Sequence, residues 1–427
     1  MKGRRIQALD KRLQRYLETM TATMDREEQK HWAGFYLRGL LLDGERKSIE
    51  PLARRVGGDV QCLQQFIGQS TWSAQGVQQT LNQFLHRQVG SGGYWLVDET
   101  SFPKQGDCSV GVARQYCGSL GKKANCQVAV SLHARNGTSG WPLGWRLYLP
   151  ESWAADQARR RRAGVPASVG FKAKTDLALE LIEEALAQGM DPGVVLADQA
   201  YGSSFVWRRR LRELGLAYGV AVNEDTGVWT EEVWQSERQG RGLGRPRQRP
   251  PRERSLRLDE LAGQLPARAW HRVTWREGSQ GPQRSRFAMA AVWASHRKGK
   301  NGRLERWQEY ALIEWPEGEP GPTRFWLSWW QGRRPRLREL VSAAKGRWPI
   351  EQDYREMKDE LGLDHFEGRS WSGWHHHVAM VTLAFGFLRL EQGRSKKKPG
   401  CDFADDQAAA DSAADSHRGL LSLVPDP

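Results

Sequence analysis

Three carboxylates stand at positions where strands end and a helix begins. Asp98 and Asp198 each follow a short apolar run typical of a buried strand. Glu351 lies just after Pro349, and proline is favoured in the first turn of a helix. Side chains beyond the carboxyl ends of strands converge on one ligand site in an α/β sheet. Because divalent cations of the Mg²⁺ type prefer oxygen ligands, and two of them can clamp a phosphodiester, the three residues indicate metal-assisted phosphodiester chemistry.

Spacing alone does not single out these residues, because the chain has 50 Asp and Glu. Glu99 neighbours Asp98 in the same expected strand and should point to the opposite face. Other candidate metal sites are disfavoured: Cys108, Cys117 and Cys126 contain no CxxC pair and are expected to be buried thiols. His375–His377 are expected on a solvated helix face, because adjacent helical residues point in different directions.

Composition indicates the kind of partner. The chain has 427 residues, enough for two or three domains, and its 64 Lys and Arg exceed its acids by a net charge of +14. Arginine is the commoner cation, which suits bidentate contact with phosphate, although a genomic bias towards arginine codons would give the same excess. The low, odd count of five cysteines and the lack of a membrane-length apolar run or a signal peptide predict a cytoplasmic protein with a polyanionic partner.

The positioning elements divide the chain into five segments. Residues 1–88 read as a helical N-terminal domain, either a helix-turn-helix DNA reader with its second helix at 59–67 or an ordinary three-helix bundle. Residues 89–222 alternate strands and helices, with strands expected at 94–97, 109–113, 127–133, 141–148, 194–197 and 218–222. Residues 223–325 read as a β-rich insertion with a basic loop that includes Arg245, Arg247 and Arg249. Residues 326–392 are expected to complete the α/β core, with a strand that opens at Trp326 and helices at 337–344, 349–361 and 373–390. Residues 393–427 are expected to be a disordered tail.

The segments around the three carboxylates resemble the three catalytic blocks of bacterial insertion-sequence DDE transposases, in the same order. They are residues 95–128, 196–202 and 347–374. That resemblance implies an α/β fold: an RNase H-like core interrupted by a β-rich insertion domain before the Glu, with the helical domain in front. It also implies that Asp98, Asp198 and Glu351 are the catalytic, metal-binding triad for Mg²⁺, with Mn²⁺ as a substitute.

In a related branch of these transposases the third block reads Tyr-x2-Arg-x3-Glu-x6-Lys, and its Arg and Lys bind DNA phosphates. The resemblance implies that Arg347 and Lys358 have these roles here. The tyrosine of this block would fall on Ala344, which is a departure from the family. Its base-stacking tryptophan falls on Trp326, with Trp329, Trp330 or a role in the core as alternatives. The implied partners are double-stranded DNA, namely the terminal inverted repeats and target DNA, and a second copy of the chain in the DNA complex.

Three functions compete at this point. The first is a transposase that cuts element ends and joins the 3′-OH to target DNA without a covalent protein–DNA intermediate. The second is a domesticated DNA-binding protein without catalysis, and the third is an RNase H-like nuclease acting on RNA–DNA hybrids. Metal-dependent nicking of element-end DNA separates the first two, and the choice of substrate separates the third.

Overall fold

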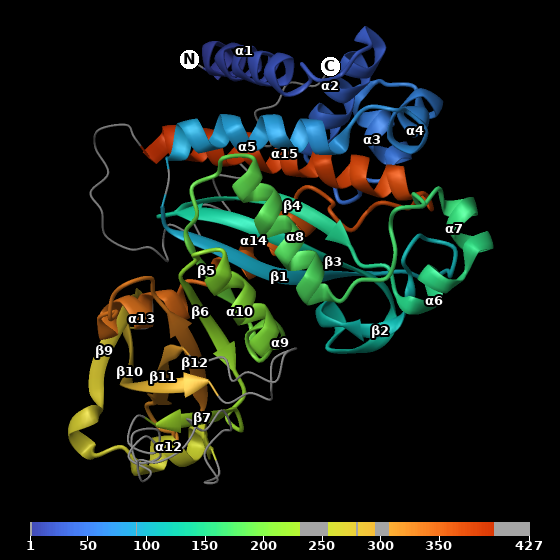
Figure 1. Cartoon of the computed structure of the whole chain (residues 1–427). Coiled ribbons are helices and arrows are strands. Elements are labelled where there is room, and N and C mark those ends of the chain that lie inside the picture. The colour runs from blue at the N-terminus through green and yellow to red at the C-terminus, as the bar shows by residue number, and fades with distance from the viewer. Residues whose placement is uncertain (1, 91, 231–254, 279–280, 295–306, 397–427) are drawn as a thin grey trace. The chain divides into compact units, whose positions relative to one another are not determined.

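The computed structural model describes residues 2–90, 92–230, 255–278, 281–294 and 307–396, and it is a mixed α/β protein (Figure 1). Contacts divide it into two units, which are described separately: residues 1–93, 97–191 and 348–427 form the first, and residues 94–96 and 192–347 form the second. No helix in the described ranges is both long enough and apolar enough to span a membrane.

The first unit begins with five helices, which confirms the expected helical character of residues 6–88. They are α1 (Lys2–Met20), α2 (Glu27–Leu41), α3 (Ile49–Val56), α4 (Val60–Gly68) and α5 (Ala74–Val89). Local capping fixes the starts of two of them: Asp59 accepts a hydrogen bond from Cys62 N–H at α4, and Ser73 accepts one from Gly76 N–H at α5. Each cap satisfies a backbone donor that has no partner inside its helix.

The sheet of the first unit is built around a long central strand, β3. Its strands are β1 (Tyr94–Pro103), β2 (Ala113–Cys117), β3 (Lys122–Asn136) and β4 (Ser139–Leu147), and β1 lies on the opposite side of β3 from β2. The start of β3 pairs antiparallel with β2, and the rest pairs antiparallel with β4. The expected strand at 109–113 is wrong for residues 109–112, which form a turn before β2.

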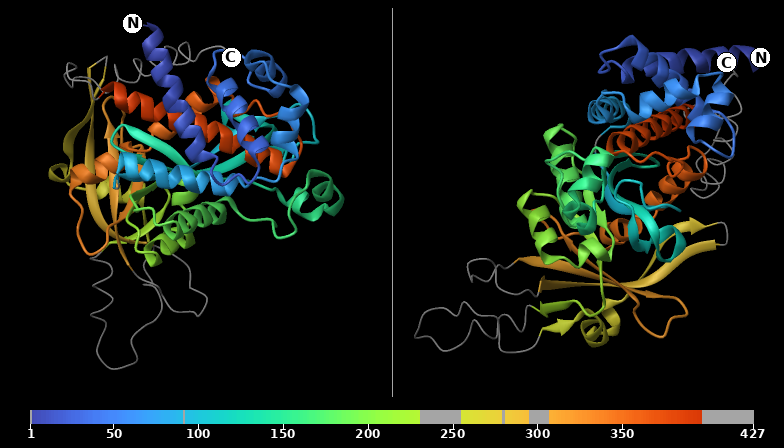
Figure 2. Two further views of the ribbon diagram at one scale, coloured as in Figure 1. Left: turned by 90° about the horizontal axis from the view of Figure 1, so that it is seen from above. Right: turned by 90° about the vertical axis from the view of Figure 1, so that its right-hand side faces the viewer.

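Helices complete the first unit. They are α6 (Glu151–Ala155), α7 (Gln157–Ala163), α8 (Lys174–Ala187), α14 (Pro349–Asp359) and α15 (Trp371–Lys396). Helix α8 packs on β3 and β4, and α5 and α15 run side by side (Figures 1 and 2). The predicted tail 393–427 overlaps the last turn of α15, and from residue 397 it lies outside the described residues.

The second unit is rich in strands and also carries short helices. Its strands are β5 (Val194–Ala197), β6 (Tyr218–Val222), β7 (Gly227–Thr230), β8 (Leu256–Arg257), β9 (His271–Gly278), β10 (Gly281–Ala294), β11 (Gln308–Pro316) and β12 (Arg324–Trp329). Their order is β5-β6-β12-β11-β10-β7-β8, with β9 also paired to β10. The helices are α9 (Gln199–Gly202), α10 (Phe205–Glu213), α12 (Leu258–Gln264) and α13 (Leu337–Lys345).

The pairing of β5 and β6 is parallel, whereas β6, β12, β11 and β10 pair antiparallel. The sheet therefore continues from β5 and β6 into the strands of residues 223–325, and its core mixes side chains from both parts, such as Val222, Val292 and Phe325. The β-rich character of this segment is seen in the structure. Its separation as an insertion domain stays a prediction.

Candidate active site

Asp98 lies within strand β1, which corrects the expectation that the strand stops at this residue. The strand continues to Pro103, because Thr100, Ser101 and Phe102 are buried and extend its pairing surface. Asp98 is only 8% exposed, and its Oδ1 accepts a hydrogen bond from Glu99 N–H at 2.8 Å. Glu99 itself pairs with Lys174, whose Nζ lies 2.7 Å from its carboxylate. Asp98 is thus a buried carboxylate within strand β1, with a hydrogen bond to the backbone of the next residue.

Glu351 lies in the first turn of α14, as the proline before it predicts. Pro349 is the first residue of the helix, and Glu351 N–H donates to Trp348 O at 3.1 Å. Glu351 is exposed, whereas the opposite face of α14 is buried through Ile350, Tyr354 and Met357. The buried face therefore holds the helix in place and leaves the carboxylate of Glu351 on the accessible side.

A buried charge network anchors α14, and sequence reasoning missed it. Asp353 is 2% exposed, and its Oδ1 accepts from Arg389 Nη2 at 2.8 Å. Its Oδ2 lies 3.3 Å from His133 Nδ1, on β3. Arg389 also pairs with Glu356 at 2.9 Å. Burial would raise the pKa of Asp353, but the hydrogen bond from His133 and the charge of Arg389 lower it, so Asp353 stays ionised and ties α14 to β3 and α15.

Lys358 is turned towards strand β1. Its Nζ donates to Ser101 O at 2.9 Å and lies 5.6 Å from the centre of the Phe102 ring. Burial lowers the pKa of this ammonium below its ordinary value, with Asp364 acting in the opposite direction. The helix that carries Glu351 is therefore joined by Lys358 to the strand that carries Asp98.

Asp198 belongs to the second unit and directly follows β5. It caps the short helix α9, where its Oδ1 accepts from Ala200 N–H at 3.0 Å. Helix α9 packs closely on β6: a Cβ added to Gly202 would lie 2.0 Å from Ala221 O, so this helix end tolerates only glycine. Arg208 Nη1 donates to Gly202 O from α10. The position of Asp198 is thus fixed by its neighbours in the second unit.

The second unit also carries two of the expected DNA-binding residues. Trp326 lies in β12, half-buried beside a cluster that includes Phe287 and Leu340, with Lys345 Nζ 5.6 Å from its ring. Arg347 follows α13 at the end of this unit. Arg245, Arg247 and Arg249 lie outside the described residues.

The donor chemistry of the three carboxylates suits Mg²⁺, which binds oxygen ligands. Asp98 and Glu351 are carried by the first unit and Asp198 by the second. Over the described ranges, no group of three or more His, Cys, Asp and Glu side chains is arranged to hold a metal ion. The structure thus provides carboxylates of the right type, each well supported locally.

The expectation of a solvated His375–His377 face is wrong for two of the three histidines. His376 is 4% exposed and lies between Ile67 O, 2.8 Å from its Nδ1, and Trp72 O, 2.9 Å from its Nε2. His377 is 1% exposed and sits between Tyr36 and Gly362. Their different directions agree with the sequence argument against a metal site. Similarly, Cys117 and Cys126 are buried as expected, but Cys108 is exposed.

We expect the free energy of unfolding to decrease as the pH falls from about 6.5 to about 4, in part through His377. Burial lowers the pKa of His377 from 6.5 to about 4. In this window the unfolded chain takes up a proton that the folded chain does not, so acid favours unfolding. At about 1.4 kcal/mol per pKa unit the loss is about 3 kcal/mol.

The measurement is urea unfolding at a series of pH values for the parent and for His377→Gln. The variant keeps a donor for Gly362 O but does not titrate, so its stability should depend less on pH over this window. The same pH dependence in both proteins would contradict the role of His377.

Comparison with known proteins identifies the family. Residues 19–282, more than half of the chain, match the DDE superfamily endonuclease family, and the chain belongs to that family. The match includes Asp98 and Asp198 and ends before Glu351. This membership, with the relative described next, confirms the resemblance to insertion-sequence DDE transposases that the three sequence segments predict.

Two individual proteins are similar to the chain. A probable transposase for insertion sequence element IS701 from Microchaete diplosiphon is 32% identical over 193 residues, which are 44% of this chain and 47% of that protein. The matched stretch therefore spans about half the length of this relative. A solved structure of the piggyBac transposase, in a synaptic complex with hairpin DNA, is 11% identical, with a TM-score of 0.42 over 93% of this chain and 71% of that chain.

Proposed function

We propose that this protein is a metal-dependent DNA transposase of an insertion sequence, which cuts the element ends and joins the freed 3′-OH to target DNA. The observation that carries the proposal is family membership together with the local support of the carboxylates: Asp98 is held in a strand interior, and Asp198 and Glu351 lie at helix starts. The partners are double-stranded DNA, with terminal inverted repeats and a target, and a second copy of the chain in the DNA complex.

In this mechanism Asp98, Asp198 and Glu351 would hold Mg²⁺, or Mn²⁺ in its place. The bound metal would supply stabilisation of the negative charge that develops during phosphodiester cleavage. Arg347 and Lys358 position DNA phosphates, and Trp326 stacks on a base. The helices of residues 1–88 and the arginine-rich stretch with Arg245, Arg247 and Arg249 bind flanking DNA, since clustered cations supply most of the sequence-independent affinity for DNA. The RNase H-like core with its insertion domain is the scaffold that these roles require.

The proposal is tested by incubating the protein with a duplex that carries the inverted repeats flanking its gene. Strand cleavage should appear with Mg²⁺ and be lost when EDTA removes the metal, because the carboxylates alone supply no activated nucleophile. A duplex with scrambled ends is the control. Binding without cleavage at any divalent metal would favour a non-catalytic DNA-binding protein, and cleavage confined to RNA–DNA hybrids would favour an RNase H-like nuclease.

Replacing Lys358 by Met should slow single-turnover cleavage by about 100-fold while DNA affinity changes little. The substitution keeps the apolar stem of the side chain but removes the ammonium that would position the DNA phosphate. A displacement of a reacting group by about 1 Å can slow a reaction by about 100-fold. Lys104→Met is a matched control, because Lys104 is a similarly buried lysine of the same unit whose Nζ donates to a backbone carbonyl, Phe366 O, at 2.5 Å. Equal losses in both variants would show that Lys358 acts only through the fold.

A further inference from the structure

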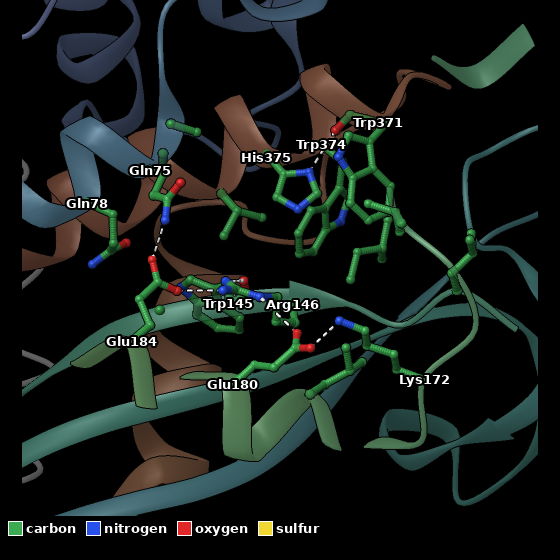
Figure 3. Close-up of a pocket in the computed structure, with 18 of the residues that line it drawn as sticks. Gln75, Gln78, Trp145, Arg146, Lys172, Glu180, Glu184, Trp371, Trp374 and His375 are labelled. Carbon is green, nitrogen blue, oxygen red and sulfur yellow. Dashed lines mark hydrogen bonds and ion pairs between the residues drawn. The ribbon is translucent and has the colours of Figure 1, made fainter. Parts of the chain in front are cut away.

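A cavity of about 480 Å³ lies in the first unit (Figure 3). Neither Asp98 nor Glu351 is among the residues that line it. Its walls come from the starts of α5 and α15, from β4, from α8 and from the exposed loop 168–172, so it opens at the surface. The volume is within the range of about 300–1,000 Å³ typical of small-molecule sites. Trp371, Trp374 and His375 at the start of α15 belong to its wall. The proposed chemistry assigns no role to these side chains.

One wall of the cavity is aromatic. The Trp371 and His375 rings lie 4.5 Å apart between centroids, and the Trp374 and His375 rings lie 4.8 Å apart. In Figure 3 the rings of Trp371, Trp374 and His375 lie together on one side, across from Arg146 and Glu180. Flat apolar faces of this kind favour a planar ring, because nucleobases stack on aromatic side chains.

His375 presents a hydrogen-bond acceptor to the cavity. Its Nδ1 lies 2.8 Å from Trp371 O, and because a carbonyl only accepts, this nitrogen must carry the proton. Burial lowers the pKa of His375 to about 4, so the ring is neutral near pH 7 and Nε2 holds a bare lone pair. Within the described part of the chain no hydrogen bond reaches Nε2 of His375, so this nitrogen can accept one from a ligand in the cavity.

The wall opposite the aromatic rings carries charged side chains whose net charge is zero. Arg146 Nη2 lies 2.5 Å from Glu184 and its Nε lies 3.9 Å from Glu180. Lys172 also pairs with Glu180, and Gln75 donates to Glu184 at 2.5 Å. Two cations and two carboxylates thus cancel one another in the wall. A phosphate group would meet no net positive charge here, so an uncharged planar ligand fits better than an anion.

We propose that this cavity binds a nucleobase that carries an exocyclic amino group, with the ring against Trp371 and the amino group donating to His375 Nε2. Such a base can come from two sources. It can be extruded from the bound DNA, a source that rests on the proposed function, or it can be a free nucleoside. Proteins that hold an extruded base combine stacking with hydrogen bonds to its polar edge, and the cavity supplies both.

The first experiment compares two nucleosides that differ by the amino group alone, deoxyadenosine and purine deoxyriboside, by calorimetric titration of the full chain. Deoxyadenosine should bind about tenfold more tightly, because only its amino group can donate a hydrogen bond to His375 Nε2. In His375→Phe, which keeps an aromatic ring but has no acceptor, this difference should vanish. His271→Phe is the matched control, since His271 is exposed on the second unit and should leave the tenfold preference intact.

The second experiment uses a duplex with one unpaired adenine and the same duplex with an unpaired purine in its place. It is performed without metal on Asp98→Asn protein, so the result does not depend on cleavage. A preference for unpaired adenine that His375→Phe removes, without binding of the free nucleoside, assigns the site to an extruded base. Binding of the nucleoside alone assigns it to a free ligand.

The inference is overturned if neither deoxyadenosine nor the adenine-bulged duplex is preferred over its purine counterpart. It is equally overturned if a preference exists but persists in His375→Phe. Loss of metal-dependent cleavage leaves these binding results unaffected, so the proposed function and the nucleobase site can fail independently. If His375→Phe does not fold, as judged by circular dichroism, the two ligand pairs still decide the question in the parent and Asp98→Asn proteins.

Discussion

Replacing Asp98 by Asn should reduce DNA strand cleavage by at least about 1,000-fold while DNA binding is kept. Asn has nearly the same shape as Asp, and its carbonyl oxygen can still accept the hydrogen bond from Glu99 N–H that holds Asp98 in β1. What is lost is the negative charge that a divalent cation needs. Stabilisation by such a cation is worth several kcal/mol, and each 1.36 kcal/mol changes a rate about tenfold.

The matched control is the neighbouring residue in the same strand. Glu99→Gln makes the same chemical change, but Glu99 pairs with Lys174 instead of belonging to the proposed triad. Its cleavage rate should stay near that of the parent. Single-turnover cleavage and equilibrium DNA binding are measured in parallel for all three proteins. A rate for Asp98→Asn within tenfold of the parent would remove Asp98 from the metal site.

The strands that match their expected bounds are those with uniformly apolar sequences. Residues 194–197 and 218–222 form β5 and β6 as expected, because short apolar runs bounded by turn residues are typical of buried strands. Strand β1 is longer than expected, since the polar run from Asp98 to Ser101 reads as a strand end. These polar side chains are buried in the structure, and burial by tertiary packing is not visible in local sequence.

The residues of the candidate site could be predicted where they lie in short sequence blocks that follow one another in the same order as in the family. The carboxylates and their flanking blocks are local features, whereas the network that anchors Glu351's helix joins residues far apart. His133 and Asp353 are 220 residues apart in sequence, and Arg389 comes from a third element. Local sequence patterns, including helical periodicity, carry no information about a pairing between residues so far apart.

A buried ion pair supports Asp198 in the second unit in a comparable way. Glu309 is fully buried on β11, and its Oε1 accepts from Arg208 Nε at 2.9 Å and from Tyr218 Oη at 2.5 Å. Arg208, on α10, also donates to Gly202 O at the end of the helix that Asp198 caps. The desolvation cost of both charges is offset only while they remain paired.

Replacing Glu309 by Ala should lower the free energy of unfolding by about 3–5 kcal/mol, because the guanidinium of Arg208 would stay buried without a counter-charge. Urea unfolding followed by tryptophan fluorescence measures the loss. The double variant Arg208→Met with Glu309→Leu should recover much of it, since apolar replacement of both partners of a buried pair is often neutral or stabilising.

Glu317→Ala is the control, because Glu317 pairs with Arg272 at the surface of the same unit and its replacement should cost less than about 1 kcal/mol. If Glu309→Ala costs no more than this control, the buried pair does not hold α10 and α9 in place, and the support of Asp198 must come from the close packing of Gly202 on β6 instead.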